Sequence, residues 1–430
     1  MIKAVKFKDR MPEMDKIKIV RVFSRLNVGG PAIHTILLTA GLNDGRFKSI
    51  LVKGSEEPYE GNMLYLAKEK GVKPIVIPEM RRSVSWLGDV KAFFKIYSLI
   101  KEKRPHIVHT HTAMAGALGR MAGFLYNMDI AFNSNGSGSK VKIVHTFHGH
   151  VLRGYFNPLK SKLLVLIERF LATFTDKIIT VSEKQREEIL GFGIGNDNKV
   201  VTIPLGLELE RFLNNGLKGE LRKELNIPWE TKLVGTIARL EPIKNHKMFI
   251  DAAAELKVKS ERLKVKFLIV GDGILRKDLE NYVKSKKLER DIIFLGFRRD
   301  LERIYADLDI VALTSLNEGS PVALIEAMAS GKAIVATDVG GLRDLFSSKL
   351  KAQSSKPGLT YYDQGILVKP GDAVSFSYAL RELLGNDGLR KKMGEMGREV
   401  VYPKYDISQL TRNMKELYEG MLSNRGACRL

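Results

Sequence analysis

Short runs of β-branched and aliphatic residues alternate with longer amphipathic segments along the whole chain. This alternation is typical of βαβ units, in which helices cover the faces of a parallel sheet. In the first half, the predicted strands span residues 17–23, 49–53, 73–77, 107–111, 142–146, 177–181 and 200–203. In the second half, they span residues 232–238, 265–270, 292–295, 310–313, 333–337 and 366–368. The pattern therefore predicts two Rossmann-like α/β sheets.

The boundary between the two sheets is predicted at residues 204–212, where a proline and a glycine interrupt the pattern before a new helix and strand begin. A chain of 430 residues also exceeds the size at which a single core normally keeps growing. We expect a first domain over residues 1–205, a second over 206–405 and a last helical segment over 406–430.

The composition limits the cellular compartments in which the protein can be expected and the kinds of partner it can bind. No run of about 18 uncharged apolar residues is present, and the single cysteine, Cys428, excludes an intramolecular disulfide and a cysteine metal cluster. We therefore expect a cytoplasmic protein. The net charge is +21, and residues 81–180 carry 15 Lys and Arg against 5 Asp and Glu. This stretch predicts an anionic partner, either a membrane surface or a phosphorylated substrate. Nucleic acid is not expected, because aromatic residues do not interleave with the basic ones.

Residues 317–329 carry two glutamates eight positions apart, Glu318 and Glu326. Ser320 is predicted as the N-cap of a helix and Pro321 as its first residue. The unsatisfied N–H groups and the positive dipole end of a helix N-terminus favour a phosphate. The two carboxylates beside it are suited to accepting hydrogen bonds from sugar hydroxyls. For two such glutamates alone, the alternative is a solvated helix face.

Two cations, Arg239 and Lys244, follow the first strand of the second half. At a strand end they can neutralise a diphosphate, because Arg forks onto two oxygens and Lys acts as a point charge. Such cations are most valuable where negative charge develops on a leaving group. No Asp-x-Asp metal motif lies near them, so we expect neither a metal nor a cofactor. The alternative is a surface salt-bridge pair.

Six of the eight histidines fall between positions 106 and 150. His109 and His111 share one face of a predicted strand, and His145, His148 and His150 follow the end of the next one. A three-histidine zinc site is therefore geometrically conceivable. Because no carboxylate ligand pattern accompanies these histidines, we predict no metal.

The E-x7-E spacing is followed by Ala-Met-Ala-Ser-Gly-Lys-Ala-Ile-Val-Ala-Thr-Asp-Val-Gly-Gly at residues 327–341 and resembles the signature of the family 4, or group 1, retaining glycosyltransferases. The Arg239 to Lys244 segment resembles the G-R-x4-K element of that family, with Ala238 in place of the usual glycine. The resemblance implies a GT-B fold of two Rossmann-like domains with parallel sheets facing across a cleft. It also implies that the C-terminal helix crosses back to the first domain.

The resemblance implies roles for residues at the matching positions. The implied catalytic residues are His111, Arg239, Lys244 and Glu318. The implied donor-binding residues are Gly29, Gly30, Arg298, Gly319, Ser320, Pro321, Val322 and Glu326. His148, in a segment similar to a loop that lines the acceptor side, is the implied acceptor-side residue.

What the resemblance implies about activity is a retaining, metal-independent transferase. It would move a sugar from a UDP- or GDP-linked donor to a glycan or polyprenyl-linked acceptor, in cell-surface polysaccharide assembly. Two alternatives stay open. One is a sugar-nucleotide epimerase of similar fold, and the other is a non-catalytic carbohydrate-binding protein on the same fold.

Residues 159–174 are strongly apolar, with Lys160, Lys162 and Arg169 among the leucines. Such coverage is typical of a buried helix in a Rossmann-like domain. It is also typical of a helix that lies in a membrane interface with its cations on anionic headgroups. The second interpretation would place the protein peripherally on the inner face of the cytoplasmic membrane.

Overall fold

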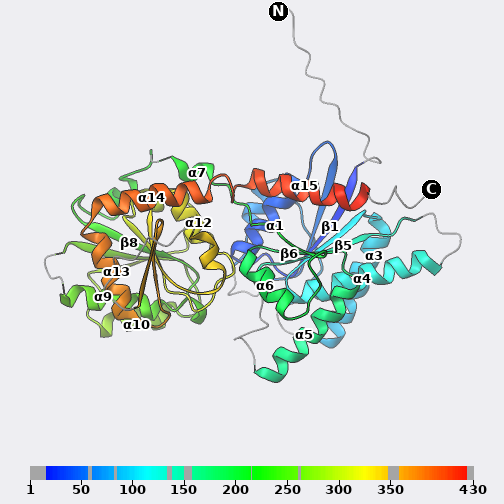
Figure 1. Ribbon diagram of the computed structural model, residues 1–430, viewed down its shortest axis with the longest axis horizontal. Helices are drawn as coiled ribbons and strands as arrows, with labels where there is room; N and C mark the ends of the chain where they lie inside the picture. The colour runs from blue at the N-terminus through cyan, green and yellow to red at the C-terminus, as the bar shows by residue number, and fades with distance from the viewer. Residues whose placement is uncertain are drawn as a thin grey trace, which may run out of the picture. The chain divides into compact units, whose positions relative to one another are not determined.

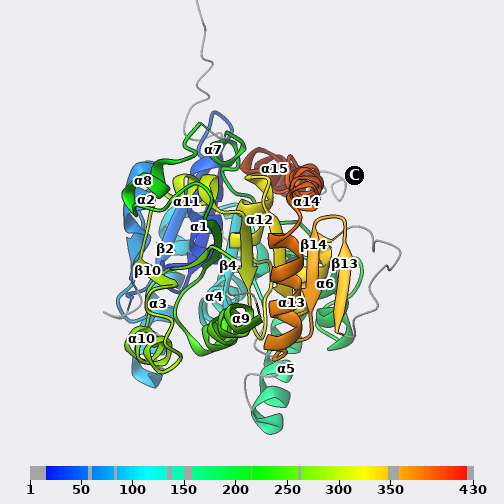
Figure 2. The same cartoon turned by 90° about the vertical axis from the view of Figure 1, so that its left-hand side faces the viewer.

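The computed structural model describes residues 16–56, 61–81, 85–132, 138–149, 157–214, 216–259, 263–346 and 358–423. These form two compact α/β units (Figures 1 and 2). The first unit comprises Met1–Val181, Arg186–Gly206 and Ile407–Leu430, and the second comprises Ser182–Gln185 and Leu207–Asp406. The C-terminal helix therefore belongs to the first unit, although it follows the second in sequence.

The first unit is built on a parallel sheet of seven described strands in the order β3-β2-β1-β4-β5-β6-β7. The strands are β1 (Ile17–Phe23), β2 (Phe47–Lys53), β3 (Ile75–Val76), β4 (Ile107–His111), β5 (Lys142–Phe147), β6 (Lys177–Thr180) and β7 (Val200–Thr202). The helices of this part of the chain are α1 (Gly30–Gly41), α2 (Leu64–Glu69), α3 (Trp86–Lys103), α4 (Ala113–Phe132), α5 (Pro158–Thr173), α6 (Glu183–Gly191) and α15 (Ile407–Ser423).

Alternation along the strands divides the core of the first unit between the two faces of the sheet. Val20 and Val22 of β1 pack in a cluster with α3 and α4. Ile19, one position away, packs in a cluster with α1 and α15. Helix α15 contributes a stripe of buried residues at helical spacing, which are Leu410, Met414, Tyr418 and Met421. Figure 1 shows α1 and α15 on one side of this sheet and α3 and α4 on the other.

Helix α5 buries few of its residues. Its buried residues are Glu168, Leu171 and Ala172, whereas five of its large apolar side chains are between 41% and 79% exposed. The interpretation of residues 159–174 as a buried helix is therefore wrong for this apolar stripe. No helix within the described ranges is long and apolar enough to span a membrane.

The second unit contains a sheet of seven described strands in the order β10-β9-β8-β11-β12-β14-β13. The strands are β8 (Lys232–Ile237), β9 (Val265–Val270), β10 (Ile292–Gly296), β11 (Ile310–Leu313), β12 (Ala333–Thr337), β13 (Leu359–Tyr362) and β14 (Gly365–Val368). The α-helices are α7 (Glu210–Leu213), α8 (Glu220–Glu224), α9 (His246–Lys259), α10 (Arg276–Ser285), α11 (Leu301–Asp307), α12 (Val322–Ala329), α13 (Ala373–Leu384) and α14 (Asp387–Val401). Two 3₁₀ helices, η2 (Pro242–Lys244) and η3 (Gly340–Leu345), follow strand ends.

The predicted pair of Rossmann-like sheets is confirmed, with one addition. Edge strand β13 pairs antiparallel with β14 and is absent from the sequence prediction. Its four residues, Leu-Thr-Tyr-Tyr, are too few for a period-2 pattern to stand out. Strand β3 has two residues where five were predicted. The remaining predicted strands agree with the structure to within one or two residues at each end.

A buried ion pair joins α4 to α5. Arg120 NH2 lies 2.8 Å from a carboxylate oxygen of Glu168, and their side chains are 0% and 8% exposed. Arg120 Nε also donates to the carbonyl of Gly116 at 2.9 Å. Burial lowers the pKa of Arg120, and the adjacent Glu168 opposes that shift. Glu168 therefore supplies the counter-charge for the Arg120 guanidinium, which has no access to solvent.

We expect Glu168→Ala to destabilise the first unit by about 3 to 5 kcal/mol, because it leaves the Arg120 cation buried and unpaired. The double variant Arg120→Met/Glu168→Leu removes both charges and recovers most of that loss. Urea denaturation followed by circular dichroism measures both. Equal destabilisation by the single and double variants would show that packing, not charge, is the contribution of Glu168.

Candidate functional site

In the second unit, the predicted cation and carboxylate meet at neighbouring strand ends. Strands β8 and β11 are adjacent and parallel, so the turns after them leave the sheet at the same edge. Lys244 ends η2 after β8, and Glu318 lies on the loop after β11. The Lys244 Nζ lies 2.6 Å from Glu318 Oε1, and their side chains are 21% and 9% exposed.

Hydrogen bonds connect the two turns. The Ser315 Oγ donates to Glu318 Oε1 at 2.6 Å. The Thr314 hydroxyl oxygen lies 3.0 Å from the carbonyl oxygen of Asn245 and 3.2 Å from that of Lys244. The Leu316 N–H donates to the carbonyl of Ile243 at 2.8 Å. The loop after β11 is thereby joined to η2 through backbone and side chain. Such preorganised groups stabilise developing charge without reorganisation.

Two glycines after β12, which were not among the predicted site residues, hold the Glu318 loop. Gly340 has a φ of +54°, and a Cβ there would lie 2.0 Å from the carbonyl oxygen of Glu318. A Cβ on Gly341 would lie 2.2 Å from the carbonyl oxygen of Gly319. The Gly341 N–H also donates to the Glu318 carbonyl at 3.1 Å. The signal was available, because both glycines close the motif at residues 327–341.

Arg239 follows β8, as predicted, but its partner in this structure is local. Its NH1 lies 2.6 Å from Glu241 Oε1, and both side chains are about one third exposed, at 34% and 30%. The salt-bridge alternative therefore describes the contact that Arg239 makes in this structure. An ion pair this exposed contributes little, so Glu241 would be a weak competitor to a phosphate for this guanidinium.

The helix after Glu318 begins later than predicted. Helix α12 begins at Val322 with Pro321 at the N-cap, and no side chain caps it. The prediction of Ser320 as N-cap is therefore wrong. Pro321 has a ψ of 99°, which is extended backbone, so the helical turn starts one residue after it. Gly319, Ser320 and Pro321 form the loop that enters the helix.

Glu326 lies in α12 and is 4% exposed. The Tyr305 hydroxyl oxygen lies 2.9 Å from the carbonyl oxygen of Ala323 and 3.2 Å from Glu326 Oε2, so its single proton is shared between these two acceptors. Burial raises the pKa of Glu326 to about 7, and nearby Arg211 opposes that shift. The carboxyl is therefore half-protonated near neutral pH.

Arg298 follows β10, where a nucleotide contact was predicted. In this structure its NH1 lies 2.5 Å from Glu224 Oε1 and its NH2 lies 2.6 Å from Asp300 Oδ2. Its guanidinium lowers the pKa of Asp300 to about 2, and these carboxylates raise the pKa of Arg298. Arg298 thus directs its donors at two carboxylates of its own unit, and its contact with a nucleotide stays a prediction.

In the first unit, three imidazoles from three elements converge. His34 lies on α1, His111 ends β4 and His148 follows β5. Their nearest ring nitrogens all lie within 4.8 Å of one another. The structure therefore brings together the two selected histidines and adds His34. His145 lies apart from this group because its Nδ1 bonds the Thr110 hydroxyl on the α4 side of the sheet, and His150 lies outside the described residues.

A buried arginine, Arg21 of β1, sets the hydrogen bonding of this cluster. Its NH1 donates to His109 Nδ1 at 2.7 Å and to His111 Nε2 at 3.3 Å. A guanidinium can only donate, so His111 Nε2 accepts and its proton sits on Nδ1. That Nδ1–H then donates to His148 Nε2 at 2.9 Å. The hydroxyl of Tyr418, on α15, lies 2.6 Å from His109 Nδ1.

The three-histidine group does not fit a divalent cation well. A tetrahedral zinc with bonds of about 2 Å keeps its ligand nitrogens roughly 3.3 Å apart. His111 and His148 are instead 2.9 Å apart, a hydrogen-bond distance. The other nitrogen of His111 faces the Arg21 cation, which would repel a metal. The geometry favours a hydrogen-bonded chain from Arg21 through His111 to His148.

All of these imidazoles are held neutral. Burial lowers the pKa of His111 well below 6.5, and neighbouring His109, His148 and Arg21 lower it further. Burial, with a contribution from Arg21, lowers the pKa of His148 to about 3. The same holds for His34, where burial is again the largest cause. The cluster can therefore accept and donate hydrogen bonds to hydroxyls without adding charge.

Two backbone features lie beside the histidine cluster. Gly29 is the N-cap of α1, which begins at Gly30. A Cβ at Gly29 would meet only the Pro31 Cδ, at 3.9 Å, so packing does not require glycine there. Thr112, directly after His111, has a φ of 64°. A β-branched residue in this region is strained, and such strain is concentrated at functional sites. Sequence alone gives no signal for it.

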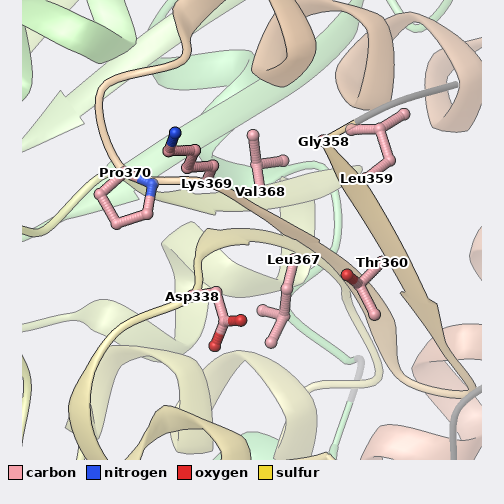
Figure 3. Close-up of a pocket in the computed structure, with 8 residues that line it drawn as sticks. All are labelled: Asp338, Gly358, Leu359, Thr360, Leu367, Val368, Lys369 and Pro370. Carbon is pink, nitrogen blue, oxygen red and sulfur yellow. The ribbon is translucent and has the colours of Figure 1, made fainter.

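A small recess lies elsewhere in the second unit (Figure 3). It has a volume of about 240 Å³ and is lined by Asp338, Gly358, Leu359, Thr360, Leu367, Val368, Lys369 and Pro370. None of these is a predicted site residue. Asp338 is also engaged by Arg343, whose Nε lies 2.7 Å from it. This recess is therefore not the candidate site.

Comparison with known proteins agrees with this geometry. Residues 28–211 match the family model described as Glycosyltransferase Family 4, and residues 218–400 match that of Glycosyl transferases group 1. The chain is 27% identical to the UDP-Gal:alpha-D-GlcNAc-diphosphoundecaprenol alpha-1,3-galactosyltransferase of Escherichia coli, over 83% of this chain and 86% of that protein. It is 23% identical to the capsular polysaccharide biosynthesis glycosyltransferase CapM of Staphylococcus aureus, over 81% and 85% of the two chains.

The fold is also similar to that of solved glycosyltransferase structures. The crystal structure of Anabaena HepE in complex with UDP and glucose superposes with a TM-score of 0.75, at 20% identity, over 94% of this chain and 99% of that one. At that identity the likeness establishes the fold alone. The two units therefore have the GT-B architecture.

We expect none of His34, His111 and His148 to become protonated between pH 5 and pH 8, because burial and Arg21 lower the pKa of the cluster. Nuclear magnetic resonance titration of the imidazole signals tests this. A signal from any of the three that moves with a midpoint near 6.5, the usual histidine value, would contradict the arrangement.

The raised pKa of Glu326 predicts a pH-dependent stability of the second unit. Below about pH 4.5 the carboxyl is protonated in both the folded and unfolded states. As pH rises to the folded value of about 7, only the unfolded state gains the charge, so stability falls. The loss reaches about 3 kcal/mol by pH 8.

Glu326→Gln removes the titrating carboxyl, so the stability of the variant relative to the parent should increase between pH 5 and about pH 7 and level off above that. The chain contains two tryptophans, so Trp86→Phe leaves Trp229 as a reporter within the second unit. Urea denaturation followed by Trp229 fluorescence in that background gives the comparison. A stability difference that does not change with pH would show that Glu326 is ionised when folded.

Proposed function

Because this chain belongs to the family 4, group 1 glycosyltransferases, we propose that it moves a sugar from a nucleotide-sugar donor to a glycan or lipid-linked acceptor in cell-surface polysaccharide assembly. The observation that carries the proposal is the pairing of Lys244 with Glu318 at 2.6 Å, at the adjoining ends of β8 and β11. One group suits a phosphate and the other suits sugar hydroxyls.

The donor is proposed to be UDP-linked, with GDP as the alternative base. The E. coli relative is named for UDP-Gal, and the Anabaena structure holds UDP and glucose. In this chain, the ribose partner is proposed to be Glu326, whose carboxyl is buried beside Tyr305. Loop residues Gly319 to Val322 are proposed to approach the sugar and the phosphate through backbone N–H groups.

The proposed reaction retains the anomeric configuration and uses no metal. The bond between the anomeric carbon and the leaving phosphate oxygen breaks, and the acceptor oxygen bonds to the same face of that carbon. The acceptor proton passes to a donor phosphate oxygen. Negative charge gathers on the diphosphate, and the cations of Lys244 and Arg239 supply the stabilisation. Lys244 must then exchange its contact with Glu318 for one with phosphate.

His111 and His148 are proposed to act as neutral hydrogen-bonding groups. His111 faces hydroxyls of the donor sugar and His148 the acceptor, with the cluster excluded from carrying charge by its lowered pKa values. A neutral imidazole orients a hydroxyl but does not take its proton at neutral pH. This assignment agrees with a donor oxygen as the base. Gly29 and Gly30 are proposed to leave room for donor or acceptor at the start of α1.

The acceptor is proposed to be carried by a polyprenyl lipid, as the name of the E. coli relative describes for its own substrate. Such an acceptor lies at the inner face of the cytoplasmic membrane, so the proposal includes peripheral contact with that surface. The epimerase and the non-catalytic alternatives are less well supported. The family matches favour a transferase, and an epimerase needs no acceptor.

We expect Lys244→Met to weaken UDP binding by about 10- to 100-fold, since it removes a charge-assisted contact with phosphate. Glu318→Gln should bind UDP at least as tightly as the parent, because Lys244 loses a competing carboxylate, but should lose turnover. Calorimetric titration with UDP, GDP and ADP in the presence of EDTA measures binding, and sugar release from UDP-sugars measures turnover.

Lys264→Met is the matched control, because Lys264 is a lysine of the same unit with a side chain 68% exposed. It should bind and turn over as the parent does. Normal sugar transfer by both Lys244→Met and Glu318→Gln would overturn the site. Failure of the parent to bind any nucleotide with EDTA present, but binding when Mg²⁺ is added, would overturn metal independence alone.

A further inference from the structure

Large apolar side chains gather on the surface of three helices of the first unit. Within the described residues, 23 large hydrophobic side chains are exposed, and 14 of them lie on α3, α4 and α5. These are Trp86, Leu87, Val90 and Phe94 of α3, Met121, Phe124, Leu125, Met128 and Phe132 of α4, and Leu159, Leu163, Leu166, Ile167 and Phe170 of α5. A monomeric soluble protein rarely exposes apolar residues in this concentration.

The exposed side chains form stripes at helical spacing. On α4 they recur at intervals of 3, 4, 7 and 11 residues from Met121, and on α5 at intervals of 4, 7, 8 and 11 from Leu159. This is the pattern that normally faces a core. Here it is directed at solvent, and Leu159 and Phe170 are 79% and 61% exposed. The sequence pattern of these stripes is that of helix faces buried in a core, whereas in the structure the same faces are exposed to solvent.

The stripes of α4 and α5 are connected. Phe124 of α4 stacks on Phe174, with ring centroids 4.6 Å apart. Phe174, directly after α5, also contacts Phe170 at 5.5 Å. The buried Arg120–Glu168 ion pair fixes the two helices to each other beneath this surface. Figures 1 and 2 both show α5 running out beyond the sheet of the first unit.

Charge identifies the partner. The exposed charges of α5 are all basic, namely Lys160, Lys162 and Arg169, since its single acid, Glu168, is buried against Arg120. Residues 81–180, which contain all three helices, carry a net charge of +10 from 15 Lys and Arg against 5 Asp and Glu. A second copy of this chain would place cations against cations. An anionic surface with an apolar layer beneath it matches both properties.

We propose that the α3–α4–α5 surface docks on an anionic lipid bilayer, with the apolar stripes inserted at the level of the acyl boundary and the lysines on the headgroups. The purpose of this docking rests on the proposed function, because a lipid-linked acceptor lies in that bilayer. The docking of this surface on a bilayer does not depend on the proposed function, since none of the surface residues belongs to the candidate site.

Co-sedimentation with vesicles tests the proposal. Wild-type protein should sediment with vesicles of phosphatidylglycerol and phosphatidylcholine in equal parts, and not with phosphatidylcholine alone. Lys160→Ala/Lys162→Ala should weaken binding to the mixed vesicles about thirty-fold. Leu163→Glu/Phe170→Glu should abolish it, because two anionic groups would replace inserted side chains. Raising the salt concentration should weaken wild-type binding.

Val258→Glu is the matched control, because Val258 is an apolar residue of α9 in the second unit that is 80% exposed. It should bind vesicles as wild type does. UDP binding should be the same in all variants, which shows that they are folded. Wild-type protein that binds UDP but no vesicle would overturn the docking proposal and leave the proposed function intact.

A partner protein or a second copy would give a different result. Dimerisation in light scattering that is lost in Leu163→Glu/Phe170→Glu, without vesicle binding by wild type, would assign the surface to a protein interface instead. Equal binding to neutral and anionic vesicles would remove the role of the lysines. Vesicle binding without UDP binding would support docking and overturn the proposed function.

Discussion

The contact between Lys244 and Glu318 depends on backbone segments that approach more closely than side chains allow. Gly340 and Gly341 lie against the carbonyls of Glu318 and Gly319, where a Cβ would come within 2.0 and 2.2 Å. On the other side, Gly271 has a φ of +133° and a Cβ there would lie 2.0 Å from the carbonyl of Ala238. Each substitution would displace one of the turns that carry the charged groups. The geometry of the site therefore requires these glycines as well as the charged side chains of Glu318 and Lys244.

In the first unit, the polar side chains of the histidine cluster are organised around a buried cation. Arg21 is fully buried, and its Nε and NH2 have no hydrogen-bond partner in the part of the chain that the structure describes. Its NH1 serves His109 and His111, and Tyr418 completes the group from α15. The cation thus orders imidazole protons and lowers the pKa of His148. Removing α15 would uncover this group, so the C-terminal helix belongs to the site as well as to the fold.

The two sheets were predictable because strands of a parallel sheet are buried on both faces and therefore appear in the sequence as continuous aliphatic runs. These runs can be recognised without knowledge of the contacts that each strand makes. The E-x7-E spacing was equally informative, because it reflects positions on one loop and one helix. The N-cap prediction was wrong, because the position assigned to Ser320 is taken by the extended backbone of Pro321, one residue later. The carboxylate partners of Arg298 were not anticipated, because no motif records the pairing with Asp300 two residues away or with Glu224 74 residues away. The contact of Arg298 with a nucleotide stays a prediction.

Helix α5 shows the limit of periodicity as evidence. An apolar stripe at helical spacing indicates that something covers it, but the sequence cannot say whether the cover is this chain. The structure leaves the stripe exposed and buries the acid that would have balanced its lysines. The two functional regions then respond to different variables. The docking surface presents basic side chains to solvent, so the salt concentration acts on that region. Burial lowers the pKa of the clustered histidines and raises that of Glu326 to about 7, so near neutral pH a change of pH acts on Glu326 of the second unit and not on these histidines.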